Sequence, residues 1–407
     1  MPFDLQRNSS DETMNLALAV EDKFKQLYGE QPLVVRSPGR VNLIGEHTDY
    51  NMGYVLPGAI DKAIYFALAP RNDHFSELHA VDMHEEHTFC LNDIHRSGQR
   101  WPDYLMGVVD QLRKAGYDFN GFNCVFGGDI PIGAGLSSSA AVEAGLAFAL
   151  NAIFELKLDK LSLVKMSQKA ENEFVGVQCG IMDQFVNIFG AENKVLRLDC
   201  RSLEFERFPF EFNDVAILLF NTNVSHSLAS SEYNKRRLEC GEGVALLRRN
   251  FPRVRSLRDV TPEMLNETAS ALGPILFRRC KYVVEENLRL LRVCESLIES
   301  DLNEVGDAMY RSHEGLSHDY EVSCAELDYL VSLVQGAPGV YGARMMGGGF
   351  GGCTINLVAK DQAGEVENLV RREYKKKFNH DPAVYEIALS VGTNIVTENA
   401  SARFLSP

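Results

Sequence analysis

The spacing of hydrophobic positions predicts alternating helices and strands over the first half of the chain. Residues 14–29 and 104–115 repeat apolar side chains at helical intervals, so each is expected to bury one face. Residues 140–154 are apolar almost throughout, which is typical of a helix that is buried on most sides. The other segments predicted here are helices at 162–174 and 182–188 and strands at 33–36, 54–69, 123–126 and 194–199.

A second series of elements begins near residue 215. The pattern loosens over residues 201–212, so we expect a domain boundary at about 200–215 and two units, 1–205 and 206–407. Because strands and helices alternate without a regular βαβ period, we predict two α+β units and no doubly wound sheet. The segments predicted in the second unit are helices at 227–248, 281–299, 302–313, 324–335 and 363–378 and strands at 215–220, 341–344, 354–359 and 383–387.

Composition and charge restrict the class of protein. The 407 residues are 45% hydrophobic and 24% charged, as in ordinary globular proteins. The net charge of −15 argues against nucleic-acid or anionic-membrane partners, because both require a basic field. Nine cysteines without a C-x-x-C pair predict reduced thiols and no zinc site. No signal peptide is evident and the longest apolar run is too short for a bilayer, so we expect a cytoplasmic protein.

A cluster of charged residues lies between Ser37 and Pro57. Arg40, Glu46, His47 and Asp49 fall within ten residues of one another, separated by glycines. Neither helical nor strand spacing orders charges in this way, and the polar groups cluster where turn residues are, so they are predicted to lie in a loop. Such loops commonly hold ligands on a rigid scaffold. The alternative interpretation is a solvated turn held by salt bridges.

Two glycine-rich segments indicate close approach to the backbone. Gly133 and Gly135 precede Ser137–Ser139, which open the helix predicted at 140–154. A glycine-rich loop that leads into a helix N-terminus is an anion site, most often for phosphate, although a capped turn without a ligand has the same composition. The sequence matches neither a Walker loop nor a Rossmann turn. Five glycines in residues 347–352 suggest that a ligand or another segment packs against bare backbone there.

Three further side chains are candidates for chemistry. Glu171 could supply a hard oxygen ligand to Mg²⁺. Asp183 could be a base or an electrostatic partner, or only the cap of the helix that begins there. Tyr233 could donate a hydrogen bond to a ligand beside the basic residues 235–237, or the segment could be a helix start with a solvated basic face.

Taken in order, these segments resemble the three motifs of the GHMP small-molecule kinases, and within that superfamily they are most similar to the galactokinases. Residues 38–51 resemble the galactokinase signature, 133–140 the phosphate loop and 347–352 the third motif, and 179–184 and 231–233 match as well. One departure is Met346, because family members commonly carry Met-Thr where this chain has Met345-Met346.

The resemblance implies an N-terminal domain like the second domain of ribosomal protein S5 and a ferredoxin-like C-terminal domain, with the active site between them. It implies transfer of the γ-phosphoryl group of ATP to the C1 hydroxyl of α-D-galactose, with Mg²⁺, at the entry to galactose catabolism. The alternatives are a galactose- and ATP-binding sensor without turnover and a kinase for N-acetylgalactosamine. The complete Ser137–Ala141 stretch disfavours the sensor. We expect a monomer.

The resemblance also implies roles for individual residues. Asp183 is expected to be the catalytic base, or a stabiliser of charge, and Arg40 is expected to orient it and to stabilise the transferring phosphoryl group. The sugar hydroxyls are expected to contact Glu46, His47, Thr48, Asp49, Gly180 and Tyr233. The triphosphate is expected on Gly133, Ala134, Gly135, Leu136, Ser137, Ser138 and Ser139, and Mg²⁺ on Ser139 and Glu171.

Overall fold

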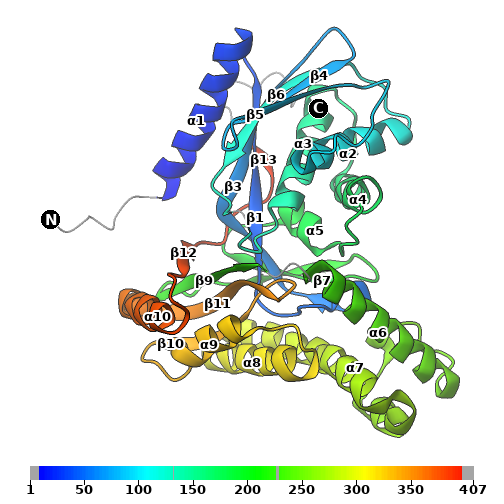
Figure 1. Ribbon diagram of the computed structural model, residues 1–407, viewed down its shortest axis with the longest axis vertical. Coiled ribbons are helices and arrows are strands. Elements are labelled where there is room, and N and C mark those ends of the chain that lie inside the picture. Colours follow the sequence, from blue (N-terminus) through cyan, green and yellow to red (C-terminus); the bar gives the residue numbers. More distant parts are fainter. Residues whose placement is uncertain (1–8, 132, 226–228, 397–407) are drawn as a thin grey trace.

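The computed structural model describes residues 9–131, 133–225 and 229–396, which form two units stacked along the long axis of the molecule (Figure 1). The N-terminal unit is built on a six-stranded sheet of order β13-β1-β3-β6-β4-β5, in which only the β4–β6 pair is parallel. Its strands are β1 (Leu33–Asn42), β3 (Pro57–Pro70), β4 (Phe75–Ala80), β5 (Glu85–Cys90), β6 (Phe122–Gly128) and β13 (Asn394–Ile395).

Helices cover both faces of this sheet. The helix α1 (Ser9–Tyr28) lies on one face, and the other face carries α2 (Arg100–Lys114), α3 (Ser138–Ile153), α4 (Lys160–Lys169) and α5 (Met182–Phe189) (Figure 1). Alternate residues of β3 supply the two cores: Tyr65 and Ala67 pack with α1, and Phe66 and Leu68 pack in the main core. A strand covered on both sides reads as a continuous apolar run, which is why residues 54–69 were recognisable from sequence.

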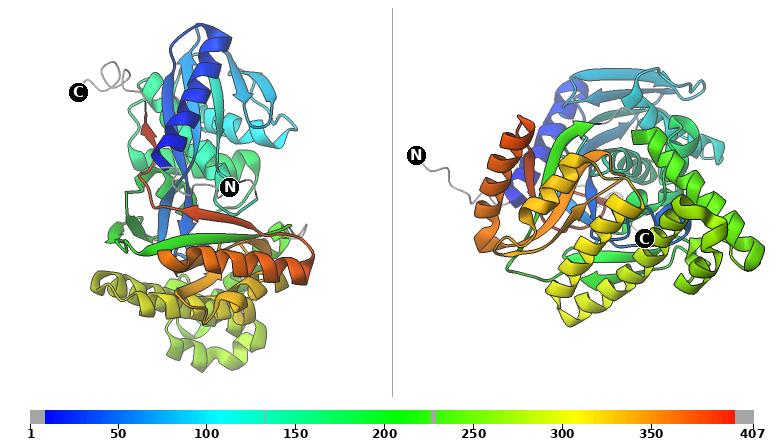
Figure 2. Two further views of the ribbon diagram at one scale, coloured as in Figure 1. Left: turned by 90° about the vertical axis from the view of Figure 1, so that its left-hand side faces the viewer. Right: turned by 60° about the horizontal axis from the view of Figure 1, so that its bottom comes forward.

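The C-terminal unit has an antiparallel four-stranded sheet of order β10-β11-β9-β12. Helices α9 and α10 pack on the sheet face away from the N-terminal unit (Figures 1 and 2). Helix α8 packs against β10, and α7 packs against α6 and α8 and also contacts the N-terminal unit. Its elements are β9 (Val215–Ser225), α6 (Ala229–Asn250), α7 (Pro262–Glu299), α8 (Leu302–Glu314), α9 (Ala325–Val334), β10 (Val340–Met345), β11 (Gly351–Ala359), α10 (Ala363–Phe378) and β12 (Ala383–Ile387).

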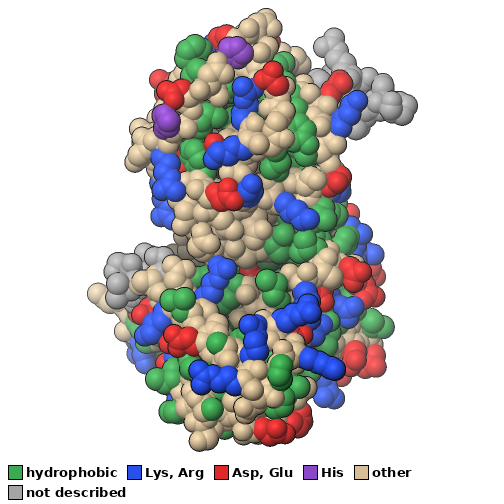
Figure 3. Space-filling model, turned by 90° about the vertical axis from the view of Figure 1, so that its right-hand side faces the viewer, with side chains coloured by type: hydrophobic (Ala, Val, Ile, Leu, Met, Phe, Trp, Pro, Cys, Tyr) green, Lys and Arg blue, Asp and Glu red, His purple; other side chains and the backbone are tan. Residues whose placement is uncertain are grey.

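The structure also contains a small third sheet and several short helical turns. A small sheet joins β2 (Tyr54–Val55), β7 (Lys194–Asp199) and β8 (Phe205–Pro209). Single turns of 3₁₀-helix occur at η1 (Asp49–Asn51), η3 (Leu257–Asp259) and η5 (Lys360–Gln362), and π-helical turns at η2 (Ala170–Val175) and η4 (Gly315–Asp319). Figure 3 shows the two units as two lobes, with side chains of both charges spread over each.

The predicted α+β fold with two units is confirmed, and most elements lie within a few residues of their predicted bounds. The loop predicted from Ser37 is wrong at its start, because β1 continues to Asn42 and is buried at all ten positions. The hairpin of β4 and β5, strand β8 and the first half of α7 were not predicted. In α7 the break at Gly273, with φ of 66°, and Pro274 interrupts the helical pattern.

The unit boundary at residues 205 and 206 stays a prediction, and the chain crosses it again near its end, because Asn394 in β13 pairs with Arg36 in β1. Residues 227 and 228 of one predicted helix lie outside the described residues. In the described ranges, no helix is both long and apolar enough to cross a membrane.

Candidate active site

A polar cavity lies between the two units, and its lining includes both predicted catalytic residues and all but one of the residues predicted to contact the sugar. The N-terminal unit supplies one wall and the C-terminal unit supplies Tyr233 from α6 and the glycine-rich segment after β10. The lining residues are Arg40, Glu46, His47, Asp49, Cys179, Gly180, Met182, Asp183, Tyr233, Gly347 and Gly348. Thus segments from four separate parts of the sequence meet at one place.

Arg40 and Asp183 form a bidentate ion pair in this cavity. Arg40 Nε lies 2.8 Å from Asp183 Oδ1, and Arg40 Nη2 lies 2.9 Å from Asp183 Oδ2. The Ser137 hydroxyl donates to Oδ2 as well. Burial opposes the positive charge of Arg40, but the carboxylates of Asp183, Glu46 and Asp49 together outweigh burial and raise the pKa of Arg40. The carboxylate of Asp183 therefore has a fixed orientation at the start of α5.

The same arginine connects Asp183 to the glycine loop, residues 133–137. Arg40 Nη1 donates to the Gly135 carbonyl oxygen at 2.6 Å. Gly133, Gly135 and Ser137 all have positive φ, of 77°, 73° and 59°. No Ser137 side-chain bond caps α3, so the backbone N–H groups at this helix start are left for another acceptor. Residue 132, beside this loop, lies outside the described residues. This is the geometry of an anion site.

The glycine loop faces the second glycine-rich segment. A Cβ on Gly347 would lie 3.8 Å from the Gly135 carbonyl oxygen, and one on Gly349 would overlap the backbone of Val322. Bare backbone therefore packs against another segment here, as the composition predicted. Met346, the departure from the family pattern, is 1% exposed and belongs to the main core.

Glu171 lies in η2 next to Ser139 at the N-terminus of α3. Its Oε2 accepts a hydrogen bond of 2.7 Å from Gln184 Nε2. Burial raises the pKa of Glu171, and hydrogen bonds from Cys179 and from the Ser139 hydroxyl oppose that rise. Burial also raises the pKa of the neighbouring Glu143 well above its usual range.

Ser139 and Glu171 thus offer hydroxyl and carboxylate oxygens side by side. This donor pair fits Mg²⁺, which in kinases takes one or two protein oxygens and completes its shell with water and phosphate. In the described part of the chain, no three His, Cys, Asp or Glu side chains form a metal cage of their own.

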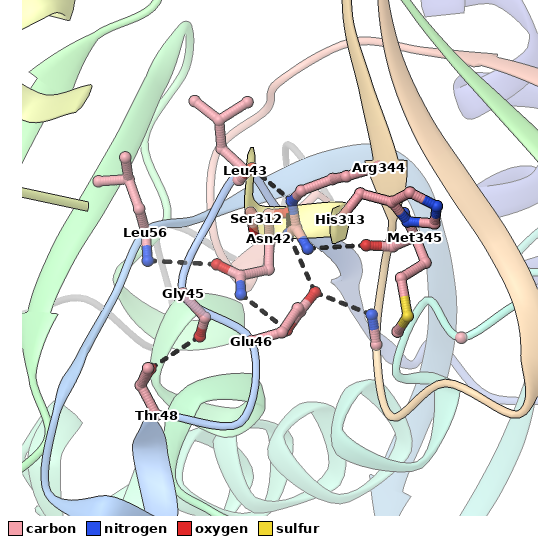
Figure 4. A network of polar contacts seen from close by, with 12 residues as sticks. Asn42, Leu43, Gly45, Glu46, Thr48, Leu56, Ser312, His313, Arg344 and Met345 are labelled. Atoms are coloured by element: carbon pink, nitrogen blue, oxygen red, sulfur yellow. Dashed lines mark hydrogen bonds and ion pairs between the residues drawn. The ribbon is translucent and has the colours of Figure 1, made fainter. Parts of the chain in front are cut away.

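Glu46 is held by a network that spans both units (Figure 4). Its Oε1 accepts from Arg344 Nη2 at 3.1 Å and from the Gly347 N–H at 2.8 Å, and its Oε2 accepts from Asn42 Nδ2 at 2.8 Å. Arg344 is fully buried and also donates to the carbonyl oxygens of Asn42 and Leu43 at 2.5 and 2.9 Å. The C-terminal unit therefore holds the polar loop, residues 43–53, in place.

A second contact between the units reinforces the first. Glu286 of α7 is fully buried and accepts from the Gly45 N–H at 2.9 Å and from the Ser312 hydroxyl at 2.7 Å. Asn287 Oδ1 accepts from the Tyr54 N–H at 2.8 Å. Because these bonds restrain backbone on both sides of Glu46, the polar loop is rigid where it meets the cavity.

His47 has an unusual backbone and a neutral ring. Its φ of 60° lies in the left-handed region, which few non-glycine residues adopt. Burial lowers the pKa of His47 to about 3, so the imidazole is neutral at physiological pH. Its Nδ1 lies 2.7 Å from the Tyr50 hydroxyl. Its Nε2 is buried, and the Gly348 backbone lies near enough to the ring to oppose this lowering of the pKa.

Asp49, Gly180 and Tyr233 complete the wall opposite the glycine loop. Burial raises the pKa of Asp49 to about 6; the Tyr50 N–H opposes this rise and the nearby Asp183 carboxylate adds to it. A Cβ on Gly180 would overlap the Asp49 carboxylate. The Tyr233 ring centroid lies 5.3 Å from that of His47, and burial keeps its hydroxyl protonated by raising the pKa well above the usual value.

Among the residues predicted to contact the sugar, only Thr48 does not line the cavity, and the predicted phosphate- and Mg²⁺-binding residues, 133–139 and 171, lie outside its lining as well. Thr48 is fully buried, and its hydroxyl donates to the carbonyl oxygens of Gly45 and Tyr54 at 2.8 and 2.5 Å. Sequence reasoning missed Arg344 and Glu286, which hold the polar loop. The sequence does contain a signal for Arg344, because it is a lone charged residue at the end of an apolar strand, shortly before five glycines.

Comparison with known proteins identifies the class. The family model for the galactokinase galactose-binding signature matches residues 22–70, the one for the GHMP kinase N-terminal domain matches 103–191 and the one for the GHMP kinase C-terminal domain matches 293–376. A crystal structure of mevalonate kinase shares the fold, with a TM-score of 0.61 at 18% identity over 88% of this chain and 99% of that chain. The matched domains and the fold are thus those of a GHMP kinase.

More similar relatives narrow the class to one family. A galactokinase from Roseiflexus sp. is 40% identical over 94% of this chain and 97% of its own length, and one from Thermotoga maritima is 40% identical over 88% and 98%. The crystal structure of Lactococcus lactis galactokinase complexed with galactose has a TM-score of 0.88 at 34% identity, covering 93% of this chain and 99% of that chain. The chain belongs to the galactokinase family.

Proposed function

We propose that this protein transfers the γ-phosphoryl group of ATP to the C1 hydroxyl of α-D-galactose, giving α-D-galactose 1-phosphate and ADP. The observation that carries the proposal is the position of Asp183, which lines the cavity together with residues of the polar loop, pairs with Arg40 and accepts a hydrogen bond from Ser137 of the glycine loop. A carboxylate at that junction can reach a hydroxyl held by the polar loop and a phosphate held by the glycine loop.

The chemistry requires one proton to leave the acceptor hydroxyl. As the C1 oxygen forms its bond to the γ-phosphorus, the bond from that phosphorus to the β–γ bridging oxygen breaks and ADP departs. Asp183 accepts the hydroxyl proton or stabilises the charge that develops on the C1 oxygen. Arg40 holds the carboxylate in place through two hydrogen bonds and presents positive charge toward the glycine loop.

The remaining lining residues suit a sugar. Glu46 and Asp49 offer carboxylate oxygens, His47 offers a neutral ring nitrogen and Tyr233 a protonated hydroxyl, which together match a ligand rich in hydroxyl groups. Gly180 leaves room beside Asp49. Because Thr48 donates to two backbone carbonyls, we assign it to shaping the loop and not to the sugar.

We also propose that ATP is bound with Mg²⁺. Residues 133–139 would cradle the phosphates and Ser139 and Glu171 would hold the ion. When bound, Mg²⁺ neutralises charge on the phosphate oxygens. We further propose that the protein is a cytoplasmic monomer, which light scattering after size-exclusion chromatography would test for the oligomeric state.

An ADP-release assay with ATP, Mg²⁺ and galactose tests the reaction. We expect turnover that EDTA abolishes, and no release above background would overturn the proposal. Asp183→Ala should retain ATP binding and lose turnover, and Arg40→Ala should lower the rate by about 10³-fold, as loss of a cation in phosphoryl transfer typically does. A near-normal kcat in either variant would contradict its assigned role.

The comparisons do not favour the two alternatives, a sensor without turnover and a kinase for N-acetylgalactosamine. A sugar panel in the same assay separates them, because specificity is a ratio of kcat/KM values. We expect the highest kcat/KM for galactose. Saturable galactose binding without ADP release would indicate the sensor.

A further inference from the structure

The first turn of α5 carries two polar side chains that lie in different surroundings. Asp183 lines the cavity and pairs with Arg40, whereas Gln184 is fully buried and does not line the cavity. Successive residues of an α-helix point about 100° apart, so one side chain can face the cavity while the next faces the interior. The position of Gln184 is therefore fixed relative to that of Asp183 by a single turn of backbone.

The amide of Gln184 contacts the carboxylate proposed to hold Mg²⁺. Gln184 Nε2 lies 2.7 Å from Glu171 Oε2, and its longer contacts are to Glu143 Oε2 at 3.4 Å and to Cys179 Sγ at 3.7 Å. A carboxylate that binds a metal ion is deprotonated, so it only accepts hydrogen bonds. The amide N–H of Gln184 is therefore the donor, and it restrains the direction in which the Glu171 carboxylate points.

The backbone around Glu171 belongs to an irregular element, whereas Gln184 belongs to a regular one. Glu171 lies in the π-helical turn η2, which ends at Gly176, a residue with φ of 91°. Gln184 lies in α5, which packs against α3, the helix that carries Ser139 in its first turn. The bond from Gln184 thus connects one proposed metal ligand to the two helices that carry Asp183 and the other proposed ligand.

We propose that Gln184 is a positioning residue that orients Glu171 for Mg²⁺ and holds this carboxylate at a fixed place relative to Asp183. This inference rests on the proposed function, which supplies the metal ion and the phosphoryl group. Because Asp183 and the metal ligands serve the same phosphoryl transfer, a small change in their separation would lower the rate. Gln184 has this role without lining the cavity or contacting the sugar.

Nucleotide binding with and without metal tests this role in the absence of turnover. Calorimetry with β,γ-imido-ATP gives one Kd in excess Mg²⁺ and one in EDTA, and the ratio of the EDTA value to the Mg²⁺ value measures what the metal site contributes. Gln184→Met keeps the length of the side chain and removes the amide. We expect the ratio to fall about tenfold, as loss of a group that orients a metal ligand typically causes. A general loosening of the site would raise both Kd values and leave the ratio unchanged.

The matched control is Gln111→Met. Gln111 is 1% exposed, and its Nε2 also donates to two carboxylates, that of Asp110 at 3.2 Å and that of Glu173 at 3.3 Å. Glu173 belongs to the same turn η2 and is not a proposed metal ligand. In both glutamines Oε1 is buried without a hydrogen-bond partner in the described part of the chain. Gln111→Met should therefore leave the ratio of Kd values unchanged.

A double-mutant cycle shows whether Gln184 acts through Glu171. Glu171→Gln should lower the ratio by itself, and Gln184→Met should lower it no further in that background. An unchanged ratio in Gln184→Met, an equal fall in Gln111→Met, or the same fall in both backgrounds of the cycle would each overturn the inference. If Gln184→Met does not fold, Gln184→Asn, which withdraws the amide by one methylene, takes its place with the same expectation.

The same measurements separate this inference from the proposed function. The galactose Kd without nucleotide should stay near the wild-type value in Gln184→Met, and a tenfold rise would overturn the inference because α5 itself would have moved. An unchanged ratio in Glu171→Gln would overturn both the metal assignment of Glu171 and the role of Gln184. Absence of ADP release by the wild type would instead refute the proposed function, while the ratio would still decide what Gln184 does.

Discussion

Replacement of Arg344 by methionine should destabilise the protein and loosen the polar loop. The guanidinium is fully buried, and it donates to the carbonyl oxygens of Asn42, Leu43 and Met345 as well as to the Glu46 carboxylate (Figure 4). Arg344→Met keeps an apolar stem of similar length and removes every one of these donors. The carboxylate of Glu46, which is 2% exposed, then stays buried without its cation.

The expected loss can be estimated from the partners that remain. Removing one partner of a buried ion pair typically costs about 3–5 kcal/mol, because the other charge is left uncompensated. Glu46 keeps hydrogen bonds from the Gly347 N–H and from Asn42, so its charge is partly compensated. We therefore expect the free energy of unfolding to fall by about 3 kcal/mol.

The chain offers a matched control. Arg36 is also buried, and it donates to the carbonyl oxygens of Val391, Ile60 and Asp61 without any ion pair among the described residues. Glu46→Gln removes the buried charge. It should recover about 1–3 kcal/mol in the Arg344→Met background. In the Arg36→Met background it should lower the stability, because the buried Arg344 would lose its counterion.

The wild type, the three single variants and the two double variants form two double-mutant cycles. Urea unfolding, followed by circular dichroism, gives the free energy of unfolding of each of these six proteins. Calorimetry measures the Kd for galactose, which reports whether the polar loop keeps its position. This Kd should rise in Arg344→Met, while the Kd for ATP changes less. The reasoning would be refuted if Glu46→Gln gave the same change in the Arg344→Met and Arg36→Met backgrounds, because the ion pair would then contribute no coupling energy.

Three further changes have definite expected results. The pKa of Asp49 is raised to about 6 by burial from an ordinary value of 3.8, so the stability that its protonated form contributes is complete below about pH 4 and is lost as the pH rises through about 6. Asp49→Asn should therefore raise the free energy of unfolding by about 3 kcal/mol at pH 7.5 and by nothing below pH 4, in urea titrations. Gly180→Ala should raise the galactose KM about tenfold or more, because its Cβ would overlap Asp49, whereas Gly364→Ala, at a position with open space, should not. Asp183→Asn should lower kcat by about 10²-fold or more with ATP affinity retained, measured by ADP release and calorimetry.

Each of these expectations has a result that contradicts it. A pH-independent difference between Asp49→Asn and the wild type would show that this carboxyl is not the group whose ionisation opposes folding. Equal galactose KM values for Gly180→Ala and the wild type would show that Asp49 can move away without loss. A kcat for Asp183→Asn close to the wild type would remove this residue from the chemical step.

The sequence by itself determined the local elements and the motifs. The spacing of apolar residues indicates which face of a helix or strand is buried. For this reason α3, β7, α10 and β12 were predicted almost to the residue. The charged cluster, the glycine loop and the segment around Asp183, taken in order, were enough to show a resemblance to the GHMP kinases, because glycine placement and residue type are local properties.

The tertiary structure alone decided what each polar side chain does. Arg40 could lie in a fully buried strand only because Asp183, 143 residues away, accepts two of its hydrogen bonds. Glu46 meets Arg344 across 298 residues, and Thr48, adjacent in sequence to His47, turns to backbone carbonyls instead of the cavity. A buried polar group is stable only when it has hydrogen-bond partners. Partners so distant in sequence cannot be predicted from the local spacing of residues.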